Sequence, residues 1–227
     1  MRGTVPTTAP GPGTRYRNQG NRPLLDLLPA YPGRLLDCGC GPGDNARLLT
    51  ARGWAVTGIT IDRAEQQAAA QYCQRVYLAD LEPGLPAAIG GRFDAVLTSH
   101  VLEHLVHPEQ LLRDVKEALK PTGVLAVALP NVVAYTNRLR LLLGRFDYTT
   151  TGVMDEGHVR FYTFVTGAQL LQRNGFYVRV ARADGAFPLS RLRHYLPPRL
   201  VAAVNQQACR RWPGLFGYQS LYVATVR

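Results

Sequence analysis

Carboxylates are absent from the C-terminal end of this chain. After Asp184 no Asp or Glu occurs, whereas six arginines and His194 follow. The net charge of +10 is therefore uneven: residues 1–113 carry a net +1 and residues 114–227 carry +9. A basic surface of this kind attracts anionic substrates, nucleic acid or an anionic membrane.

Long apolar runs are also lacking. None approaches the ~20 residues that a membrane span needs, and residues 1–22 have no apolar segment of the secretory type. Cysteines are few, at positions 38, 40, 73 and 209. Because no second pair accompanies Cys38 and Cys40, we predict no metal site, and we expect reduced thiols in a cytoplasmic protein.

A glycine-rich turn stands out between an apolar run and a predicted helix. Leu35 and Leu36 lead to Asp37, and glycines follow at alternate positions, Gly39, Gly41 and Gly43. Without Cβ atoms the backbone can turn sharply and approach a ligand closely, and that ligand meets free N–H groups at the helix start. Dinucleotide sites need G-x-G-x-x-G. Here Asp44 would face a pyrophosphate, so we disfavour a nicotinamide cofactor.

Strand-like and helix-like segments alternate along the chain. The strands are near-continuous apolar runs, as in parallel sheets covered on both faces, so we predict an α/β doubly wound sheet. The expected strands are 34–38, 54–59, 75–79, 93–99, 124–129, 176–181 and 221–226; the expected helices are 23–31, 43–52, 62–70, 108–120, 132–143, 164–173 and 197–210.

Three parts of the chain are expected. Residues 1–22, rich in Pro, Gly and Thr, read as a flexible arm. Residues 23–184 are expected to form a core with a lid insertion at about 132–163, and a polar loop of this length is usually functional or mobile. Residues 185–227 form a basic helical cap and the final strand.

The run Leu36-Asp37-Cys38-Gly39-Cys40-Gly41-Pro42-Gly43 resembles motif I of the class I S-adenosylmethionine-dependent methyltransferases. The resemblance extends to about Asn131. Residues 158–163 and 174–176 resemble the small-molecule subgroup that includes ubiquinone-biosynthesis O-methyltransferases. The resemblance implies a Rossmann-like methyltransferase fold with seven strands, of which the last is antiparallel, and S-adenosyl-L-methionine as cofactor.

The resemblance also implies cofactor-binding positions. The turn wraps the methionine part of the cofactor and Asp37 holds its amino group; Thr60 stands where the family usually has an acidic ribose ligand, and Glu65 takes up the ribose in cyclopropane-synthase-like relatives. Asp80 matches the residue that bonds the adenine amino group. The full expected set is Asp37, Gly39, Cys40, Gly41, Gly43, Thr60, Ile61, Glu65, Asp80, Leu81 and Ser99. The alternative is that Asp62 and Glu65, or Asp80, merely cap helices.

For the acceptor side we predict His158 as the catalytic residue and His104 as the second candidate, with Arg160 and Tyr162 contacting substrate. An imidazole titrates near neutral pH and can take a proton from an acceptor hydroxyl. Alternatively, His158 only anchors the insertion through a hydrogen bond, and catalysis rests on alignment alone.

We therefore expect methyl transfer to a small-molecule acceptor, with O- or C-methylation favoured. We expect an anionic or lipid-linked acceptor, and the basic segment 185–217 is a candidate for peripheral membrane contact. An RNA-directed enzyme is the alternative, but Ser99-His100-Val101-Leu102 replaces the Asn/Asp-Pro-Pro-aromatic run of amine-directed nucleic-acid methyltransferases. A non-catalytic cofactor-binding partner is the other class considered.

Overall fold

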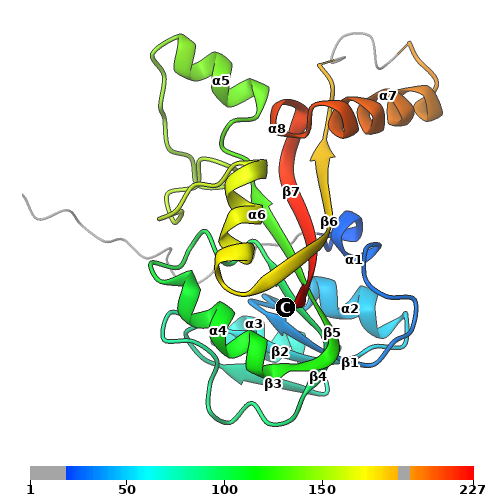
Figure 1. Cartoon of the computed structure of the whole chain (residues 1–227), viewed down its shortest axis with the longest axis vertical. Helices are drawn as coiled ribbons and strands as arrows, with labels where there is room; N and C mark the ends of the chain where they lie inside the picture. The colour runs from blue at the N-terminus through cyan, green and yellow to red at the C-terminus, as the bar shows by residue number, and fades with distance from the viewer. Residues whose placement is uncertain (1–18, 189–194) are drawn as a thin grey trace, which may run out of the picture.

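The computed structural model describes residues 19–188 and 195–227. Its centre is a seven-stranded sheet of order β3-β2-β1-β4-β5-β7-β6 (Figure 1). All neighbouring strands are parallel except β7, which is antiparallel to both β5 and β6. The strands are β1 Arg34–Cys38, β2 Ala55–Thr60, β3 Arg75–Leu78, β4 Phe93–Ser99, β5 Leu119–Pro130, β6 Phe176–Gly185 and β7 Gly217–Val226. The predicted fold class is thus confirmed.

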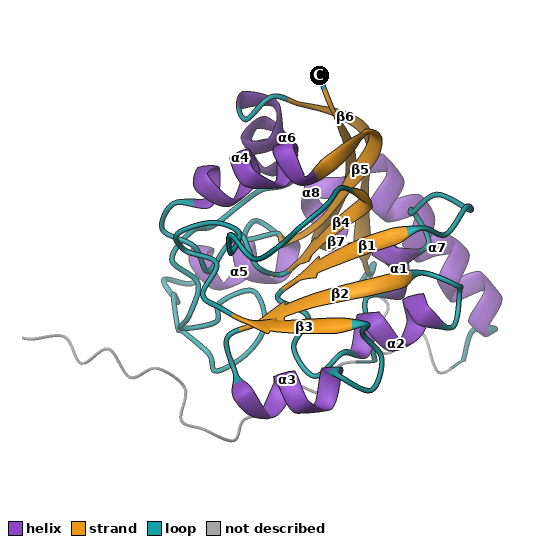
Figure 2. Ribbon diagram, turned by 90° about the horizontal axis from the view of Figure 1, so that it is seen from below, coloured by secondary structure: helices purple, strands orange, loops and turns teal. Residues whose placement is uncertain are grey.

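Helices cover both faces of this sheet (Figure 2). They are α1 Arg22–Leu25, α2 Asp44–Thr50, α3 Arg63–Ala69, α4 Pro108–Ala118, α5 Tyr135–Leu142, α6 Phe164–Arg173, α7 Pro198–Arg211 and α8 Pro213–Phe216. Adjacent residues of one strand serve opposite faces: Leu35 packs with Leu24 and Leu49, whereas Leu36 packs with Leu111 and the residues of α4. This double burial explains the continuous apolar runs.

The chain order reverses between β1 and β4, which are neighbours in the sheet. In open α/β sheets ligands bind outside the carboxyl ends of the strands at such a switch point. The glycine turn after β1 and the loop after β4 therefore meet at one edge, which we call the carboxyl edge.

Some boundaries differ from expectation. The helix predicted at 23–31 is the single turn α1, which Asn21 caps by accepting a hydrogen bond from the Leu24 N–H. The predicted break at Pro121–Gly123 lies inside β5, where the pairing with β4 shifts register between Phe93 and Ala95. The chain bulges there and stays in the sheet, because a bulge accommodates residues that cannot pair.

The lid insertion predicted at 132–163 begins and ends at the same place. The Val132 N–H donates to the Tyr162 carbonyl at 2.9 Å, and Asn131 bridges Tyr162. Helix α5 rises from this base, and α7 and α8 stand beyond the ends of β6 and β7 (Figure 1). Of the predicted arm, residues 1–18 lie outside the described residues, as do 189–194 of the basic segment. No helix in the described part of the chain is long and apolar enough to cross a membrane.

Candidate functional site

The glycine turn links β1 to α2 through left-handed backbone. Gly39, Gly41 and Gly43 have φ of +74°, +52° and +92°, angles that side chains with a Cβ rarely adopt. A Cβ on Gly43 would lie 3.0 Å from the Ala69 Cα, so this glycine lets α3 pack against the turn. A Cβ on Gly41 would meet nothing closer than the Glu65 Oε1 at 3.9 Å. Gly41 thus leaves open space at the carboxyl edge.

Asp37, at the penultimate position of β1, is fully buried. Neither carboxylate oxygen has a hydrogen-bond partner among the described residues. Burial raises the pKa of Asp37 to about 8, because a charge in an apolar interior loses its hydration. A buried carboxylate of this kind fits a ligand that brings a positive donor, such as an amino group.

Cys40 contributes backbone and packing to the turn. Its N–H donates to the Ile59 carbonyl at 2.8 Å. Its side chain is buried, and a Cβ on Gly58 of β2 would lie 2.7 Å from the Cys40 Sγ and 3.2 Å from the Cys73 Sγ. The hydrogen bond with Cys73, together with burial, raises the pKa of Cys40, so the thiol stays protonated and is a core group.

Thr60 and Glu65, the expected ribose ligands, contact each other. The Thr60 hydroxyl donates to the Glu65 Oε2 at 2.8 Å. Asp62 caps α3 by accepting from the Glu65 N–H at 2.8 Å, whereas the Glu65 carboxylate accepts from Thr60 and does not cap the helix. Glu65 is therefore aimed across the carboxyl edge toward Gly41, and Asp62 alone has the capping role.

The remaining expected cofactor residues surround the same edge. Ile61 is 73% exposed, an arrangement that a ligand covering it would stabilise. Asp80 is exposed and accepts from the Glu82 N–H at 2.9 Å, whereas Leu81 is buried in the core. The Ser99 hydroxyl accepts from the Asn21 side chain at 3.2 Å.

The loop after β4 carries a strained histidine. His100 has φ of +59°, a left-handed value in a residue with a Cβ, and such strain concentrates at functional sites. Its Nδ1 lies 3.2 Å from the Glu103 Oε1 and its Nε2 lies 3.1 Å from the Gln219 Oε1. Partial burial acts to lower the pKa of His100, whose side chain is 41% exposed, but Glu103 and Gln219 outweigh this effect and raise the pKa.

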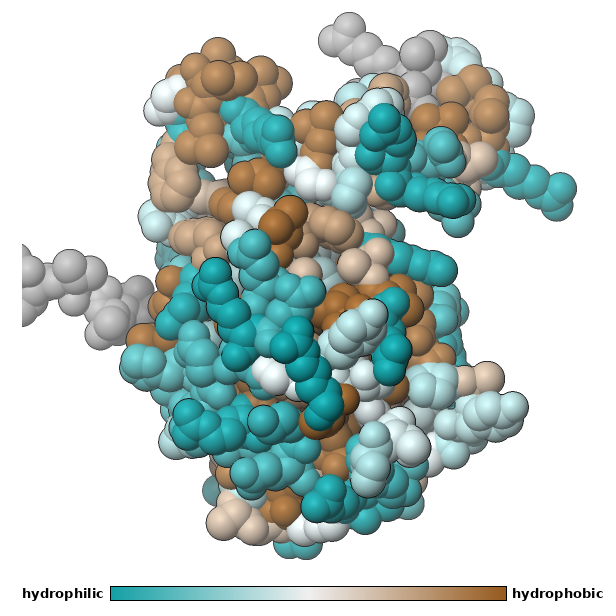
Figure 3. Space-filling model, viewed as in Figure 1, coloured by the Kyte–Doolittle hydropathy of each residue, from teal (hydrophilic) through white to brown (hydrophobic). Residues whose placement is uncertain are grey.

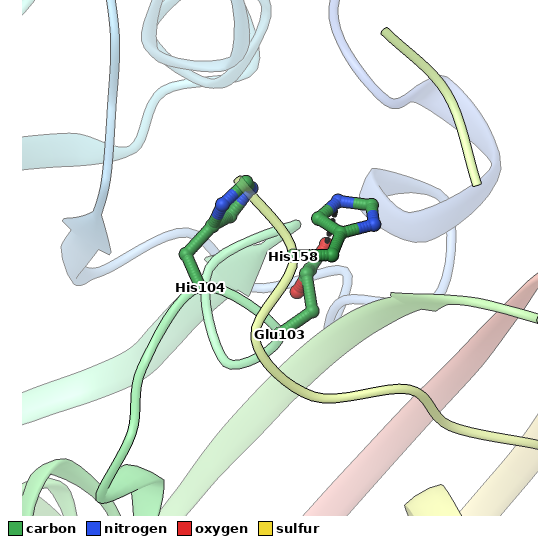
Figure 4. Close-up of side chains that lie close together, drawn as sticks. All are labelled: Glu103, His104 and His158. Atoms are coloured by element: carbon green, nitrogen blue, oxygen red, sulfur yellow. Dashed lines mark ion pairs between the residues drawn. The ribbon is translucent and has the colours of Figure 1, made fainter. Parts of the chain in front are cut away.

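The two predicted catalytic histidines lie side by side. The rings of His104 and His158 have centroids 4.7 Å apart in an edge-to-face arrangement. The insertion is fixed here because the Val159 and Arg160 N–H groups both donate to the Glu103 carbonyl at 3.0 Å. Both rings stand above the Glu103 carboxylate (Figure 4). Burial lowers the pKa of His158, which favours a neutral imidazole.

The two predicted substrate residues take different positions. The Arg160 guanidinium donates to the Val106 carbonyl and pairs with Glu109 at 3.7 Å, so it ties the insertion to the start of α4. Tyr162 is 7% exposed, and its hydroxyl has no partner within the described part of the chain. Burial raises the pKa of Tyr162 to about 12. The contacts of Arg160 and Tyr162 within the protein do not by themselves indicate a role in substrate binding.

Asn21 and Gln219 complete the carboxyl edge, and the sequence analysis did not single them out. The Asn21 side chain donates to the Gln219 Oε1 at 2.9 Å, across 198 positions of sequence. Gln219 also reaches His100 and Asp184. No local pattern marks either residue, because their partners come from opposite ends of the chain.

Comparison with known proteins gives a consistent family. Residues 14–180 match the family model described as a methyltransferase domain. A trans-aconitate 2-methyltransferase of Deinococcus radiodurans is 30% identical over 189 residues, which cover 82% of this chain and 71% of that protein. A ubiquinone biosynthesis O-methyltransferase of Caulobacter vibrioides is 38% identical over 102 residues, 43% of this chain and 40% of that protein. The chain thus spans less than half the length of some curated relatives.

Solved structures share the fold. A SAM-dependent methyltransferase from Archaeoglobus fulgidus superposes with a TM-score of 0.62 at 19% identity and 90% coverage of both chains. Magnesium protoporphyrin IX methyltransferase from Synechocystis, solved with bound SAH, gives a TM-score of 0.53 at 17% identity and covers 86% of this chain and 75% of that one.

Proposed function

Because this chain belongs to the methyltransferase domain family and uses S-adenosyl-L-methionine, we propose that it methylates an oxygen or an acidic carbon of a small-molecule acceptor. The bound cofactor supplies an activated methyl group on a sulfonium. The protein then has to align the acceptor and, for a hydroxyl or carbon acid, to accept a proton. The observation that carries the proposal is a glycine turn whose buried carboxylate has no partner among the described residues, together with the paired imidazoles of His104 and His158.

The residues of the turn fit the cofactor. Asp37 offers a carboxylate to its amino group, and Gly41 leaves room for close backbone approach. Glu65, held by Thr60, faces the same space and is suited to accept from ribose hydroxyls. We assign Asp80, Ile61 and Leu81 to the adenine end, and Ser99 to the rim between cofactor and acceptor.

The acceptor side offers proton acceptors. His158 and His104 each donate Nδ1–H to a backbone carbonyl, so the Nε2 lone pair of each ring is available. We assign the acceptor-side chemistry to this pair. The segment around Arg160 and Tyr162 positions the histidines and closes the acceptor side, because Arg160 ties it to the loop before α4.

The surface near this edge supports one class of acceptor. Five large apolar residues at the tip of α5 and just after it are between 48% and 83% exposed, namely Leu139, Leu141, Leu142, Leu143 and Phe146. Arg138 directly precedes them in the sequence, and Arg140 and Arg145 lie between them. Figure 3 shows this tip as a brown patch that projects from the molecule. Apolar and cationic residues together suit an anionic lipid surface. We therefore favour an anionic or lipid-linked acceptor over nucleic acid.

In the deciding experiment the protein is incubated with methyl-labelled S-adenosylmethionine and with either an organic or an aqueous extract of host metabolites. Labelled products are then identified by mass spectrometry. A labelled product that appears with the wild type and not with a Gly41→Val variant supports the proposal. A parallel reaction contains added RNA, and label confined to that RNA would support the alternative acceptor. No labelled product in either extract, from a chain that binds S-adenosylhomocysteine, would point to a cofactor-binding partner protein instead.

The lipid preference has its own measurement. Co-sedimentation with vesicles should be stronger for anionic than for neutral lipid, and Leu142→Gln should weaken it. Equal recovery with both vesicle types would remove the electrostatic argument.

A further inference from the structure

Three side chains at the acceptor side converge on one point. Glu103 and His104 come from the loop after β4, and His158 comes from the insertion (Figure 4). One ligand atom from each lies within 4.8 Å of the others, and the His158 Nε2 is 4.0 Å from the Glu103 Oε1. His158 is more than fifty residues away from the other two in the sequence. The Glu103 carbonyl brings it close by accepting hydrogen bonds from the backbone of the insertion.

The hydrogen bonds fix which ring nitrogens carry protons. His158 Nδ1 lies 3.0 Å from the Val153 carbonyl, and His104 Nδ1 lies 2.9 Å from the Gly157 carbonyl. A carbonyl only accepts, so each Nδ1 must be the donor and each neutral ring keeps its lone pair on Nε2. An imidazole that gives its other N–H to a carbonyl is the usual state of a metal-ligating histidine.

The carboxylate of the cluster lacks a full set of partners. Glu103 is 0% exposed, its Oε1 is shared with His100 at 3.2 Å, and its Oε2 has no partner among residues 19–188 and 195–227. The cluster therefore presents a buried anionic oxygen and two lone pairs with no proton donor between His158 and Glu103. His100 compensates the Glu103 charge only through Oε1, so a cation bound among the three ligand atoms would supply the partner that Oε2 and the two lone pairs lack within the described residues.

We propose that Glu103, His104 and His158 bind one divalent transition-metal cation of the zinc type. Two imidazoles and one carboxylate are a known catalytic zinc set that keeps a further position open, whereas Mg²⁺ prefers oxygen ligands and waters. Ligand atoms around tetrahedral zinc are about 3.4 Å apart, given bonds of roughly 2.1 Å. The observed spacing requires a closing movement on the order of an ångström.

This inference rests on the proposed methyl transfer and refines its acceptor chemistry. An acceptor hydroxyl oxygen would take the open position, and the cation would lower the pKa of that hydroxyl, so that its proton leaves to water. The lone pairs of His104 and His158 are then occupied by the cation, and neither imidazole removes the proton directly.

The test measures Zn²⁺ binding without any acceptor. The chelator-treated full chain is titrated with Zn²⁺ by isothermal calorimetry, alongside Glu103→Gln, His104→Ala and the control His107→Ala. His107 is an exposed imidazole outside the cluster. We expect one Zn²⁺ per chain, at least about tenfold weaker binding in the two cluster variants, and no change in the control. S-adenosylhomocysteine affinity should remain at the wild-type value in all of them, which verifies folding.

Two results would overturn the inference. One is a wild-type chain that takes up no stoichiometric Zn²⁺. The other is undiminished binding in His104→Ala, which would place the ion on other groups such as the Cys40 and Cys73 thiols. If Glu103→Gln fails to fold, His104→Ala still tests the inference, because the His104 side chain is exposed and its removal should not prevent folding. A chain that binds Zn²⁺ but labels no metabolite loses only the proposed function. A chain that binds Zn²⁺ and also methylates an acceptor in chelator keeps the binding site and loses only the cation's part in the chemistry.

Discussion

The two sides of the carboxyl edge are built in different ways. On the cofactor side the key bonds are local: Thr60 binds Glu65, and Asp62 caps the helix that contains Glu65. On the acceptor side they are distant: His104 binds Gly157 across 53 positions, and His100 binds Gln219 across 119. Local bonds close short loops at small entropic cost, whereas distant ones form only when the whole sheet has assembled.

The two sides also differ in charge. The cofactor side ends in Asp37, a carboxylate with no partner in the described part of the molecule, whereas the acceptor side presents imidazoles around the partly satisfied Glu103. Each side lacks partners for some of its polar groups, and the missing partner indicates the ligand. The cofactor side needs a positive donor, and the acceptor side needs an acidic hydroxyl or a cation. The contrast teaches that one sheet edge can hold two sites in which buried carboxylates recruit different ligands, because their neighbouring side chains differ.

The sharpest test of the cofactor side is Gly41→Val. The new side chain would occupy the open space between the turn and Glu65 and would be strained at φ of +52°. We expect S-adenosylhomocysteine binding, measured by calorimetry, to be abolished. Gly144→Val is the matched control, because Gly144 also has a positive φ, of +69°, and a Cβ there would meet nothing within 4 Å. A folded Gly41→Val chain with unchanged affinity would refute the assignment of the turn.

The acceptor side is separated from the cofactor side by His158→Ala. Loss of a group that accepts the proton or holds a cation should lower turnover by about 10²-fold or more, with little change in cofactor affinity, because His158 is not part of the turn. Single-turnover kinetics and S-adenosylhomocysteine titration measure the two effects. If kcat is retained and only the acceptor KM rises, His158 binds the acceptor and catalysis rests on alignment.

The smallest effect, at most about tenfold per pH unit, concerns the protonation of Asp37. Its pKa of about 8 in the folded chain exceeds the ordinary 3.8, so between these values the unfolded chain releases a proton that the folded chain keeps. Stability of the ligand-free protein should therefore fall as pH rises from about 4 to 8, as followed by thermal melting.

Ligand binding reverses that dependence. A cofactor amino group needs the ionised carboxylate, so S-adenosylhomocysteine affinity should rise with pH, by at most about tenfold per pH unit, and level off above pH 8. Asp37→Asn should bind more weakly and with a flat profile over the same range. A wild-type profile that is already flat between pH 6 and 8 would mean that Asp37 is not the amino-group ligand.

Much of the fold could be predicted from the sequence. Apolar runs located all seven strands, and β1 and β4 begin and end as expected, because a strand buried on both faces leaves a continuous apolar signal. Boundaries were less well predicted where tertiary contacts decide them: α1 is one turn long, and β6 and β7 extend beyond their apolar centres because they pair with each other.

The candidate site divides along the same line. The sequence alone determined the glycine turn, its leading Asp37 and the family resemblance, since turn chemistry is encoded in adjacent residues. Only the tertiary structure brought His104 and His158 to Glu103, aimed the Glu65 carboxylate at Thr60 and set Asn21 beside Gln219. Cysteine spacing predicted no metal site and cannot reveal one made of Glu and His. The sequence around each of these residues does not predict its partner, because the contacts form only when the sheet places distant segments at one edge.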